Sequence, residues 1–266
     1  MSASASKPYT SIVHTIYTTS EIPSRWRDSA RTWVAVNRDF AHCHWTWPEL
    51  EAFVGAEYPW LASTYRGYRY FIQRCDVARY MFLYRYGGAY VDLDISCLTP
   101  LAGVFADAPD AAGAVFEPAR PFGVATDFIA VRRPRDPVLR GVLSGLRRAD
   151  ASWWYLPLPY TTVMYRSGPV YLTRRVTCHR PRAQLHVIPW SKHPAYFGHV
   201  GGASWHSWDG WIIWRVYLVR HHLLRLLVIV TVLAVLVCVC RNRRSISNNW
   251  QNRFGLRSRT KDSAAD

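Results

Sequence analysis

The sequence predicts an α/β domain, with a mainly parallel sheet flanked by helices, followed by one C-terminal transmembrane helix. Between residues 9 and 210, short β-branched apolar stretches alternate with stretches of helical spacing, which is the pattern of a parallel sheet. Residues 226–240 then form a run of fifteen residues without a charge. The 266-residue chain is 50% hydrophobic and 15% aromatic, which excludes a disordered or collagen-like protein.

The first part of the domain contains two predicted strands and two predicted helices. Ser11–Tyr17 is apolar and β-branched, as expected of a buried first strand. The next predicted elements, in order, are a helix over Ile22–Val36 with Pro23 near its start, a strand over Phe40–Trp45 and a helix over Pro48–Phe53.

The middle of the chain contains the clearest helix. Over Gln73–Tyr84 the apolar residues Val77, Met81 and Tyr84 share one face. Gly87 and Gly88 are expected to end this helix, because glycine tolerates the left-handed conformation of a helix stop. The later predicted elements are a strand over Ala89–Ile95, a strand over Thr126–Val131 and a helix over Val138–Arg147.

The apolar segment near the end is predicted as a membrane helix over residues 223–240. Its length is close to the roughly 20 residues that span a bilayer. Basic residues flank both ends, so they do not fix an orientation. A buried core element is the alternative interpretation. The predicted organisation is a disordered N-terminus (1–8), the folded domain (9–210), a juxtamembrane segment (211–222), the membrane helix (223–240) and a basic, disordered tail (241–266).

Arginine dominates the charge of the chain. Basic residues outnumber acidic ones by 33 to 18, and the formal net charge is +15. This balance favours phosphorylated small molecules, anionic lipid surfaces or nucleic acid as partners, but no nucleic-acid-binding module is visible, so we expect no nucleic-acid partner. No CxxC pair is present, which argues against a zinc ribbon. Four cysteines before the apolar segment form either disulfides or buried thiols: Cys43, Cys75, Cys97 and Cys178.

Two pairs of charged residues carry the candidate chemistry. In an extended strand Asp92 and Asp94 project to the same face, where two carboxylates repel unless a divalent cation compensates them. A solvated strand end is the alternative. Asp76 and Arg79 are three residues apart on one helix face, and an arginine beside an acidic metal site suits a diphosphate. A surface ion pair is the alternative there.

These residues lie in a run that resembles a known family. The pattern R-x-D-x-x-R-Y…L-Y-x-Y-G-G-x-Y-x-D-x-D…L-x-P-L, over residues 74–101, is similar to the DxD-containing enzymes of glycosyltransferase family 32. Further segments resemble the family in the same order: SIVHTIY with IPSRWRDSARTWVAVN, residues 48–59, GVATDFIAVRRPRDPVL, YTTVMYRSGPVYLT and HVGGASWHSWDG.

The resemblance implies a GT-A fold, a nucleotide-sugar donor, a divalent metal (Mn²⁺ or Mg²⁺) and retention at the anomeric carbon by front-face displacement. By position, Asp94 would bind the metal, and Asp92 would contact the donor ribose and metal-bound water. His199 or His206 would complete the metal ligands.

The resemblance also implies residues that hold the donor. Asp76 and Arg79 would contact the sugar hydroxyls and the diphosphate, and Arg79 would stabilise the charge of the leaving group. The remaining implied donor-binding residues are Ser204 and Trp205, which would close over the diphosphate, and Thr126 with Asp127. Thr126 stands where the family usually has Asn, a departure from the ordinary sugar-binding segment.

The mannosyl inositol-phosphoceramide synthase branch is the most similar. It implies GDP-mannose as donor, an anionic sphingolipid or glycolipid acceptor, a regulatory subunit as partner, and a single-pass place in the endomembrane system, at the Golgi. A UDP-sugar-dependent transferase acting on a glycan or protein is the alternative enzyme. A catalytically silent sugar-nucleotide-binding module is the alternative from another class, and intact Asp92, Asp94 and Arg79 argue against it.

Overall fold

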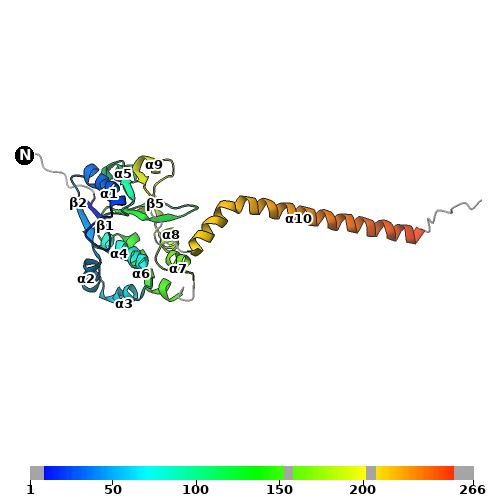
Figure 1. The fold of residues 1–266 in the computed structure, drawn as a ribbon, viewed down its shortest axis with the longest axis horizontal. Coiled ribbons are helices and arrows are strands. Elements are labelled where there is room, and N and C mark those ends of the chain that lie inside the picture. The colour runs from blue at the N-terminus through cyan, green and yellow to red at the C-terminus, as the bar shows by residue number, and fades with distance from the viewer. Residues whose placement is uncertain (1–8, 153–157, 202–207, 255–266) are drawn as a thin grey trace, which may run out of the picture. The chain divides into compact units, whose positions relative to one another are not determined.

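The computed structural model describes residues 9–152, 158–201 and 208–254. A central sheet lies between two layers of helices, with α1, α5 and α9 on one side and α2, α3, α4 and α6 on the other (Figure 1). The strands are β1 (Ile12–Ile16), β2 (Ala41–Trp45), β3 (Gly88–Val91), β4 (Ile95–Cys97), β5 (Ala114–Pro118), β6 (Val124–Val131), β7 (Leu185–Val187) and β8 (Phe197–His199).

The helices of the domain lie between these strands. They are α1 (Ser24–Val36), α2 (Trp47–Glu57), α3 (Pro59–Gly67), α4 (Phe71–Tyr86), α5 (Leu101–Asp107), α6 (Pro137–Ser152), α7 (Pro159–Arg166), α8 (Pro169–Cys178) and α9 (His193–Tyr196), with a 3₁₀ turn at Arg182–Gln184. All the elements predicted from sequence up to α4 are present, with ends shifted by a few residues, and so are β6 and α6. The structure adds α3, α5, α7, α8, α9, β4, β5, β7 and β8.

The six strands of the central sheet are ordered β2-β1-β3-β6-β5-β7. β1 is parallel to β2 and β3, and β5 is parallel to β7. β6 runs antiparallel to both β3 and β5. The predicted α/β class with a mainly parallel sheet is therefore confirmed, with β6 as the reversed strand. A separate antiparallel pair joins β4 to β8.

The sheet separates two apolar cores. Successive residues of β3 alternate between them: Tyr90 packs in the core beneath α4 and α6, and Ala89 and Val91 pack in the core beneath α1 and α5. The α4 side is the larger and contains Tyr65, Met81 and other fully buried side chains. These cores fix α4 and β3, which carry the candidate site, from both faces of the sheet.

The junction between α4 and β3 needs its two glycines. Gly87 has φ +70° and its N–H bonds the carbonyl of Leu83, which ends the helix as predicted. Gly88 has φ +87°, and a Cβ there would meet the carbonyl oxygen of Ile12 at 2.3 Å. The close approach of β1 at this point thus requires glycine.

The thiols before α10 are free in the structure. Cys75 and Cys97 are buried, Cys43 is half-buried and Cys178 is exposed. Burial raises the pKa of Cys75 and of Cys97. The buried-thiol interpretation therefore holds for Cys75 and Cys97, and no disulfide is present among the described residues.

The chain divides into two compact units, residues 1–210 and residues 211–266. A single helix, α10 (Trp208–Phe254), extends through the predicted juxtamembrane segment and the predicted membrane helix. It also includes residues 241–254, which the sequence assigned to a disordered tail. Neither glycine nor proline occurs from Trp211 to Phe254, whereas Gly255 follows, so the two residues that most often end a helix are absent from it.

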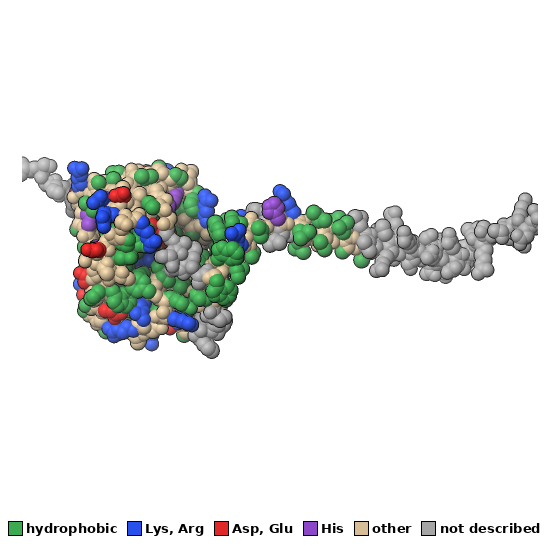
Figure 2. Space-filling view, in the orientation of Figure 1, with side chains coloured by type: hydrophobic (Ala, Val, Ile, Leu, Met, Phe, Trp, Pro, Cys, Tyr) green, Lys and Arg blue, Asp and Glu red, His purple; other side chains and the backbone are tan. Residues whose placement is uncertain are grey.

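The described part of α10 is strongly apolar on its surface (Figure 2). No single helix among the described residues has both the length and the apolar character needed to cross a bilayer. Two segments, Trp208–Arg220 and Leu224–Val235, pass that test together and meet at a bend of 58°. The predicted single span over 223–240 therefore stays a prediction.

Candidate functional site

Helix α4 presents a buried ion pair to the end of the sheet. Asp76 and Arg79 lie one turn apart on the same face, as predicted, with 3.4 Å between their nearest charged atoms. Both side chains are almost completely buried, at 2% and 1% exposure. The alternative of a surface ion pair is therefore wrong, because neither side chain is at the surface. Two buried charges are costly unless other polar groups bond to them.

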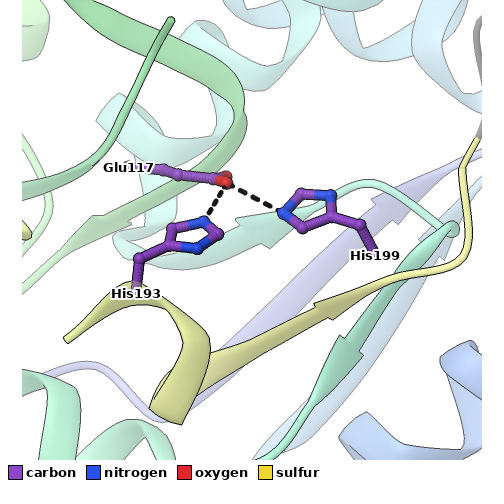
Figure 3. Close-up of side chains that lie close together, drawn as sticks. All are labelled: Glu117, His193 and His199. Carbon is purple, nitrogen blue, oxygen red and sulfur yellow. Dashed lines mark hydrogen bonds and ion pairs between the residues drawn. The ribbon is translucent and has the colours of Figure 1, made fainter. Parts of the chain in front are cut away.

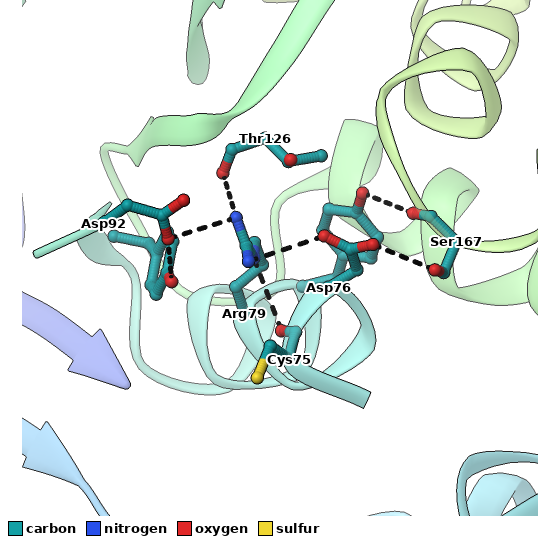
Figure 4. A network of polar contacts seen from close by, with 8 residues as sticks. Cys75, Asp76, Arg79, Asp92, Thr126 and Ser167 are labelled. Carbon is teal, nitrogen blue, oxygen red and sulfur yellow. Dashed lines mark hydrogen bonds and ion pairs between the residues drawn. The ribbon is translucent and has the colours of Figure 1, made fainter. Parts of the chain in front are cut away.

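The guanidinium of Arg79 joins three parts of the chain (Figure 4). It donates to the backbone carbonyl of Thr126 at 2.5 Å and lies 3.5 Å from the carboxylate of Asp92. It also lies over the ring of Tyr90, 4.3 Å from the ring centroid. These partners more than offset burial and raise the pKa of Arg79, so it carries a fixed positive charge at the site.

Asp76 lies behind this arginine and orients it. Its other carboxylate oxygen accepts a hydrogen bond from Ser167 at 2.9 Å, just before α8, and the Thr126 side chain is also bonded to it. Burial raises the pKa of Asp76 to about 6 despite these partners. The structure thus gives Asp76 and Thr126 contacts with Arg79, at 2% and 4% exposure.

The Asp92–Asp94 segment is a turn, which corrects the predicted continuous strand over Ala89–Ile95. β3 ends at Val91, and the N–H of Ile95 bonds back to the carbonyl of Asp92 at 3.2 Å. The chain turns because β3 pairs within the central sheet, whereas β4 pairs with β8. Val91, Leu93 and Ile95 are nevertheless all buried, as predicted.

Helix α1 holds this turn through three side chains. Ser29 donates to the carbonyl of Leu93 at 2.8 Å, and the Trp33 indole donates to the carbonyl of Ile95 at 2.7 Å. Thr32 accepts from the N–H of Cys97 at 2.8 Å. A turn anchored on both sides keeps its two carboxylates in place.

Acidic groups gather at this turn. Asp92 accepts a short hydrogen bond from Tyr90, and its N–H bonds the carbonyl of Asp127 at 2.9 Å. Burial and the neighbouring acids raise the pKa values of Asp92, Asp94 and Asp127, most of all that of Asp127. Arg79 lowers the pKa of Asp92, but the net shift is upward, because burial and the neighbouring acid Glu117 oppose ionisation.

A fourth acid, Glu117 at the end of β5, was not predicted from sequence. Its Oε1 accepts from Nε2 of His193 at 2.6 Å and from Nε2 of His199 at 3.1 Å (Figure 3). Its Oε2 is buried without a hydrogen-bond partner among the described residues. The one signal in the sequence was an acid inside the apolar stretch AVFEP, and nothing local marked His193.

The donor set fits a divalent cation of the kind predicted. The carboxylates of Asp92 and Asp94 supply hard oxygen ligands, and His199, whose charge acts on both, supplies one nitrogen, a combination that suits Mn²⁺. One potential ligand atom from each of Glu117, His193 and His199 lies within 4.8 Å of the other two. The mutual repulsion of Asp92, Asp94 and Asp127 is the feature that a cation at the turn would relieve.

A cavity of about 410 Å³ opens onto the turn. Arg79, Asp92 and Asp94 supply its charged wall. Its remaining wall is largely aromatic and aliphatic: Ile16, Tyr17, Trp26, Tyr70, Phe71, Ile72, Cys75, Tyr90, Leu93, Pro159 and Val163. Of the other predicted site residues, Ser204, Trp205 and His206 lie outside the residues that the structure describes.

A buried arginine and two turn carboxylates beside a cavity of an α/β domain define a class of proteins suited to hold a phosphate-bearing ligand together with a cation. Residues 23–111 match the family model described as "Glycosyltransferase sugar-binding region containing DXD motif". The model that matches is thus that of the DXD glycosyltransferases, the kind of family that the sequence patterns predicted.

Curated relatives agree with this assignment. The chain is 31% identical over 208 residues to Inositol phosphoceramide mannosyltransferase 3 of Schizosaccharomyces pombe, covering 73% of this chain and 55% of the relative. It is 33% identical over 165 residues to a Mannosyl phosphorylinositol ceramide synthase of Saccharomyces cerevisiae, covering 61% and 41%. The chain thus spans about half the length of the curated relatives it matches.

A solved structure supports the fold. PaToxG Glycosyltransferase superposes with a TM-score of 0.50 and 14% sequence identity, covering 65% of this chain and 70% of that chain. At this identity the likeness speaks for the glycosyltransferase fold alone, and it agrees with the predicted GT-A architecture.

Proposed function

We propose that the chain is a metal-dependent, retaining mannosyltransferase that moves mannose from GDP-mannose to an inositol-phosphoceramide-type sphingolipid. The observation that carries the proposal is the joining of Arg79, Asp92 and Asp94 on one wall of the cavity. The names of the curated relatives support mannose and the sphingolipid class. The UDP-sugar alternative and the silent module remain outcomes of the test.

In this proposal each charged residue has a separate task. Asp92, Asp94 and His199 would hold Mn²⁺ or Mg²⁺, which when bound neutralises phosphate charge as a Lewis acid. Arg79 faces the cavity with a fixed charge and stabilises the negative charge that develops on the departing diphosphate. Asp76 keeps the guanidinium oriented, and Asp127 lies beside Asp92 on the donor side.

The acceptor enters from the apolar side of the same cavity. Phe71 is 41% exposed, and Phe71, Tyr70, Ile72 and Val163 all line the cavity together with the carboxylates. An apolar wall beside a charged one suits an amphipathic acceptor, whose polar head reaches the reacting centre.

We also propose that the chain works at an endomembrane, at the Golgi, as a single-pass protein with an accessory subunit. Support comes from the lipid acceptors named for the relatives and from the apolar, arginine-flanked sequence of residues 223–240. Localisation of the tagged full chain by microscopy, with residues 223–240 deleted as the comparison, tests this. A deletion that leaves the distribution unchanged contradicts the anchoring role.

The test of activity is transfer by the full chain with and without Mn²⁺. GDP-mannose and UDP-glucose are each offered with inositol phosphoceramide, and the Asp94→Asn variant is compared with the matched surface variant Asp110→Asn. We expect Mn²⁺-dependent transfer from GDP-mannose, a loss of about 100-fold or more for Asp94→Asn and no loss for Asp110→Asn, which is exposed.

Other results would point elsewhere. Transfer from UDP-glucose alone would keep the enzyme class and overturn the donor. Binding of either donor without any transfer would favour the silent module. Full activity of Asp94→Asn would remove the DXD metal site from the proposal.

A further inference from the structure

The Glu117 carboxylate is the meeting point of three elements. It comes from the end of β5, His193 from α9 and His199 from β8, and both imidazoles point to the same oxygen (Figure 3). Glu117 is only 3% exposed, whereas the side chain of His199 is 39% exposed. The buried carboxylate of Glu117 therefore contacts the half-exposed imidazole of His199 from the interior of the protein.

This contact determines which nitrogen of His199 is free. The N–H at Nε2 donates a hydrogen bond to Glu117, so in the neutral ring the unprotonated nitrogen with the free lone pair is Nδ1. A metal ion binds the unprotonated nitrogen, and the carboxylate on the other nitrogen fixes both tautomer and ring orientation. The Glu117 contact thus prepares Nδ1 as a ligand.

Backbone pairing places His199 beside the DXD turn. His199 pairs with Ile95 in the β4–β8 ladder, and the N–H of Val200 donates to the carbonyl of Asp94 at 2.9 Å. Asp94 and Asp127 are close enough for their charges to act on the imidazole. The imidazole of His199 therefore lies within reach of the charges of Asp94 and Asp127.

His193 is the anchor of this arrangement. It is 8% exposed, and its ring is parallel to that of His199 at 5.4 Å between centroids, with Trp190 and Phe197 on its other sides. Enclosed in this way, it donates to Glu117 at 2.6 Å, the shorter of the two bonds. His193 therefore fixes the carboxylate, and the carboxylate fixes His199.

We propose that Glu117 is a positioning residue, which together with His193 orients His199 Nδ1 toward a divalent cation shared with Asp94. The inference rests on the proposed metal site of the DXD turn. It adds a requirement for two residues that are neither in the DXD motif nor next to it in the sequence.

The test is Mn²⁺ titration of the full chain by calorimetry, with no substrate present. The variants are Glu117→Gln, His193→Gln and Asp94→Asn, with His186→Gln on β7 as the matched histidine control. We expect Asp94→Asn to abolish binding, Glu117→Gln to weaken it about 10–100-fold, His193→Gln to weaken it less, and His186→Gln to leave it unchanged. Thermal unfolding in EDTA identifies any variant that does not fold.

A second readout needs no variant. In ¹⁵N spectra of the histidine-labelled wild-type chain, His199 should be protonated at Nε2, and its Nδ1 signal should broaden first on adding Mn²⁺. Protonation at Nδ1 in the neutral ring overturns the inference, whatever the variants do.

The outcomes separate the inference from the function on which it rests. If Asp94→Asn loses Mn²⁺ while a folded Glu117→Gln binds as wild type does, the positioning role is wrong and the metal site stands. If Glu117→Gln abolishes binding and Asp94→Asn has no effect, the cation is held by Glu117 and the histidines themselves, which also overturns positioning. If neither substitution matters, both the metal site and the inference fail.

Discussion

At the scale of single residues, Arg79 shows why the site needs a guanidinium. Its nitrogens reach Asp76, Asp92 and the Thr126 carbonyl at once from a position with 1% exposure. A lysine carries the same charge on one nitrogen and cannot satisfy three groups in a plane. The partners left without a donor are themselves buried, and such groups are costly.

We therefore predict that Arg79→Lys lowers stability by about 1–3 kcal/mol and slows transfer about 100-fold. The measurements are thermal unfolding and initial rates with GDP-mannose. The control is Arg85→Lys on the same helix, whose pair with Glu57 is exposed, and we expect no change there. An Arg79→Lys enzyme with wild-type rates would show that the planar guanidinium is not needed for transfer.

His14 gives a second residue-scale prediction, concerning pH. Nε2 of His14 donates to the Gly87 carbonyl at 3.0 Å, and Nδ1 accepts from the Trp45 indole at 3.2 Å, so the ring has no place for a second proton. Burial lowers the pKa of His14 from 6.5 to about 4. As pH falls below 6.5 the unfolded chain takes up this proton first, so stability is lost between pH 6.5 and 4.

His14→Gln keeps a donor to Gly87 but has no group that titrates here. Its unfolding free energy should fall less than that of the wild type on acidification, and between pH 6.5 and 5 the difference should reach about 1.5 kcal/mol. Urea titrations of both chains at the two pH values measure it. The raised pKa of Asp76 acts with the opposite sign in the same range, but it is common to both proteins and cancels. Equal losses in the two chains would mean that His14 is protonated in the fold.

At the scale of elements, the junction of α4 and β3 sets the position of the whole site. Gly88→Ala would place a side chain on a residue with φ +87° and put its Cβ 2.3 Å from the carbonyl oxygen of Ile12. The backbone of Ile12 cannot move away without separating β1 from β3. We expect a loss of at least about 2 kcal/mol. Gly67→Ala at the end of α3, where a Cβ meets nothing within 4 Å, is the control and should be neutral. Differential scanning calorimetry compares them, and equal melting temperatures would refute the requirement.

Elements also show what the sequence could predict. Spacing within one helix predicts α4 itself, its end at Gly87 and the shared face of Asp76 and Arg79. These predictions are confirmed. The break after Val91 does not, because alternation of apolar residues continues through it and only pairing with β8, far along the chain, makes the turn. Glu117 and His193 were missed for the same reason: their meaning lies in a contact between β5 and α9.

At the scale of the whole molecule, the two units differ in what stabilises them. Every buried residue of the two apolar cores lies between Val13 and Phe197. In the second unit, by contrast, large apolar side chains such as Trp211, Trp214 and Leu227 are exposed. The first unit therefore contains both apolar cores, whereas the described side chains of the second unit are apolar and exposed.

The last described residues of the first unit contribute to it directly. Asp209 is 2% exposed and accepts the N–H of Tyr160 at 2.9 Å and of Thr161 at 3.4 Å, at the start of α7. We predict that the fragment 1–210 folds and melts as the full chain does, whereas the fragment 1–207 is less stable by about 1 kcal/mol, since the start of α7 loses its cap. Circular dichroism melts measure this difference. With anionic vesicles, flotation should carry the full chain but not 1–210, because most of the exposed large apolar side chains of the described residues lie beyond Gly210. A 1–210 fragment that floats would place membrane contact on the domain itself, and one that fails to fold would show that its core needs the helix that follows.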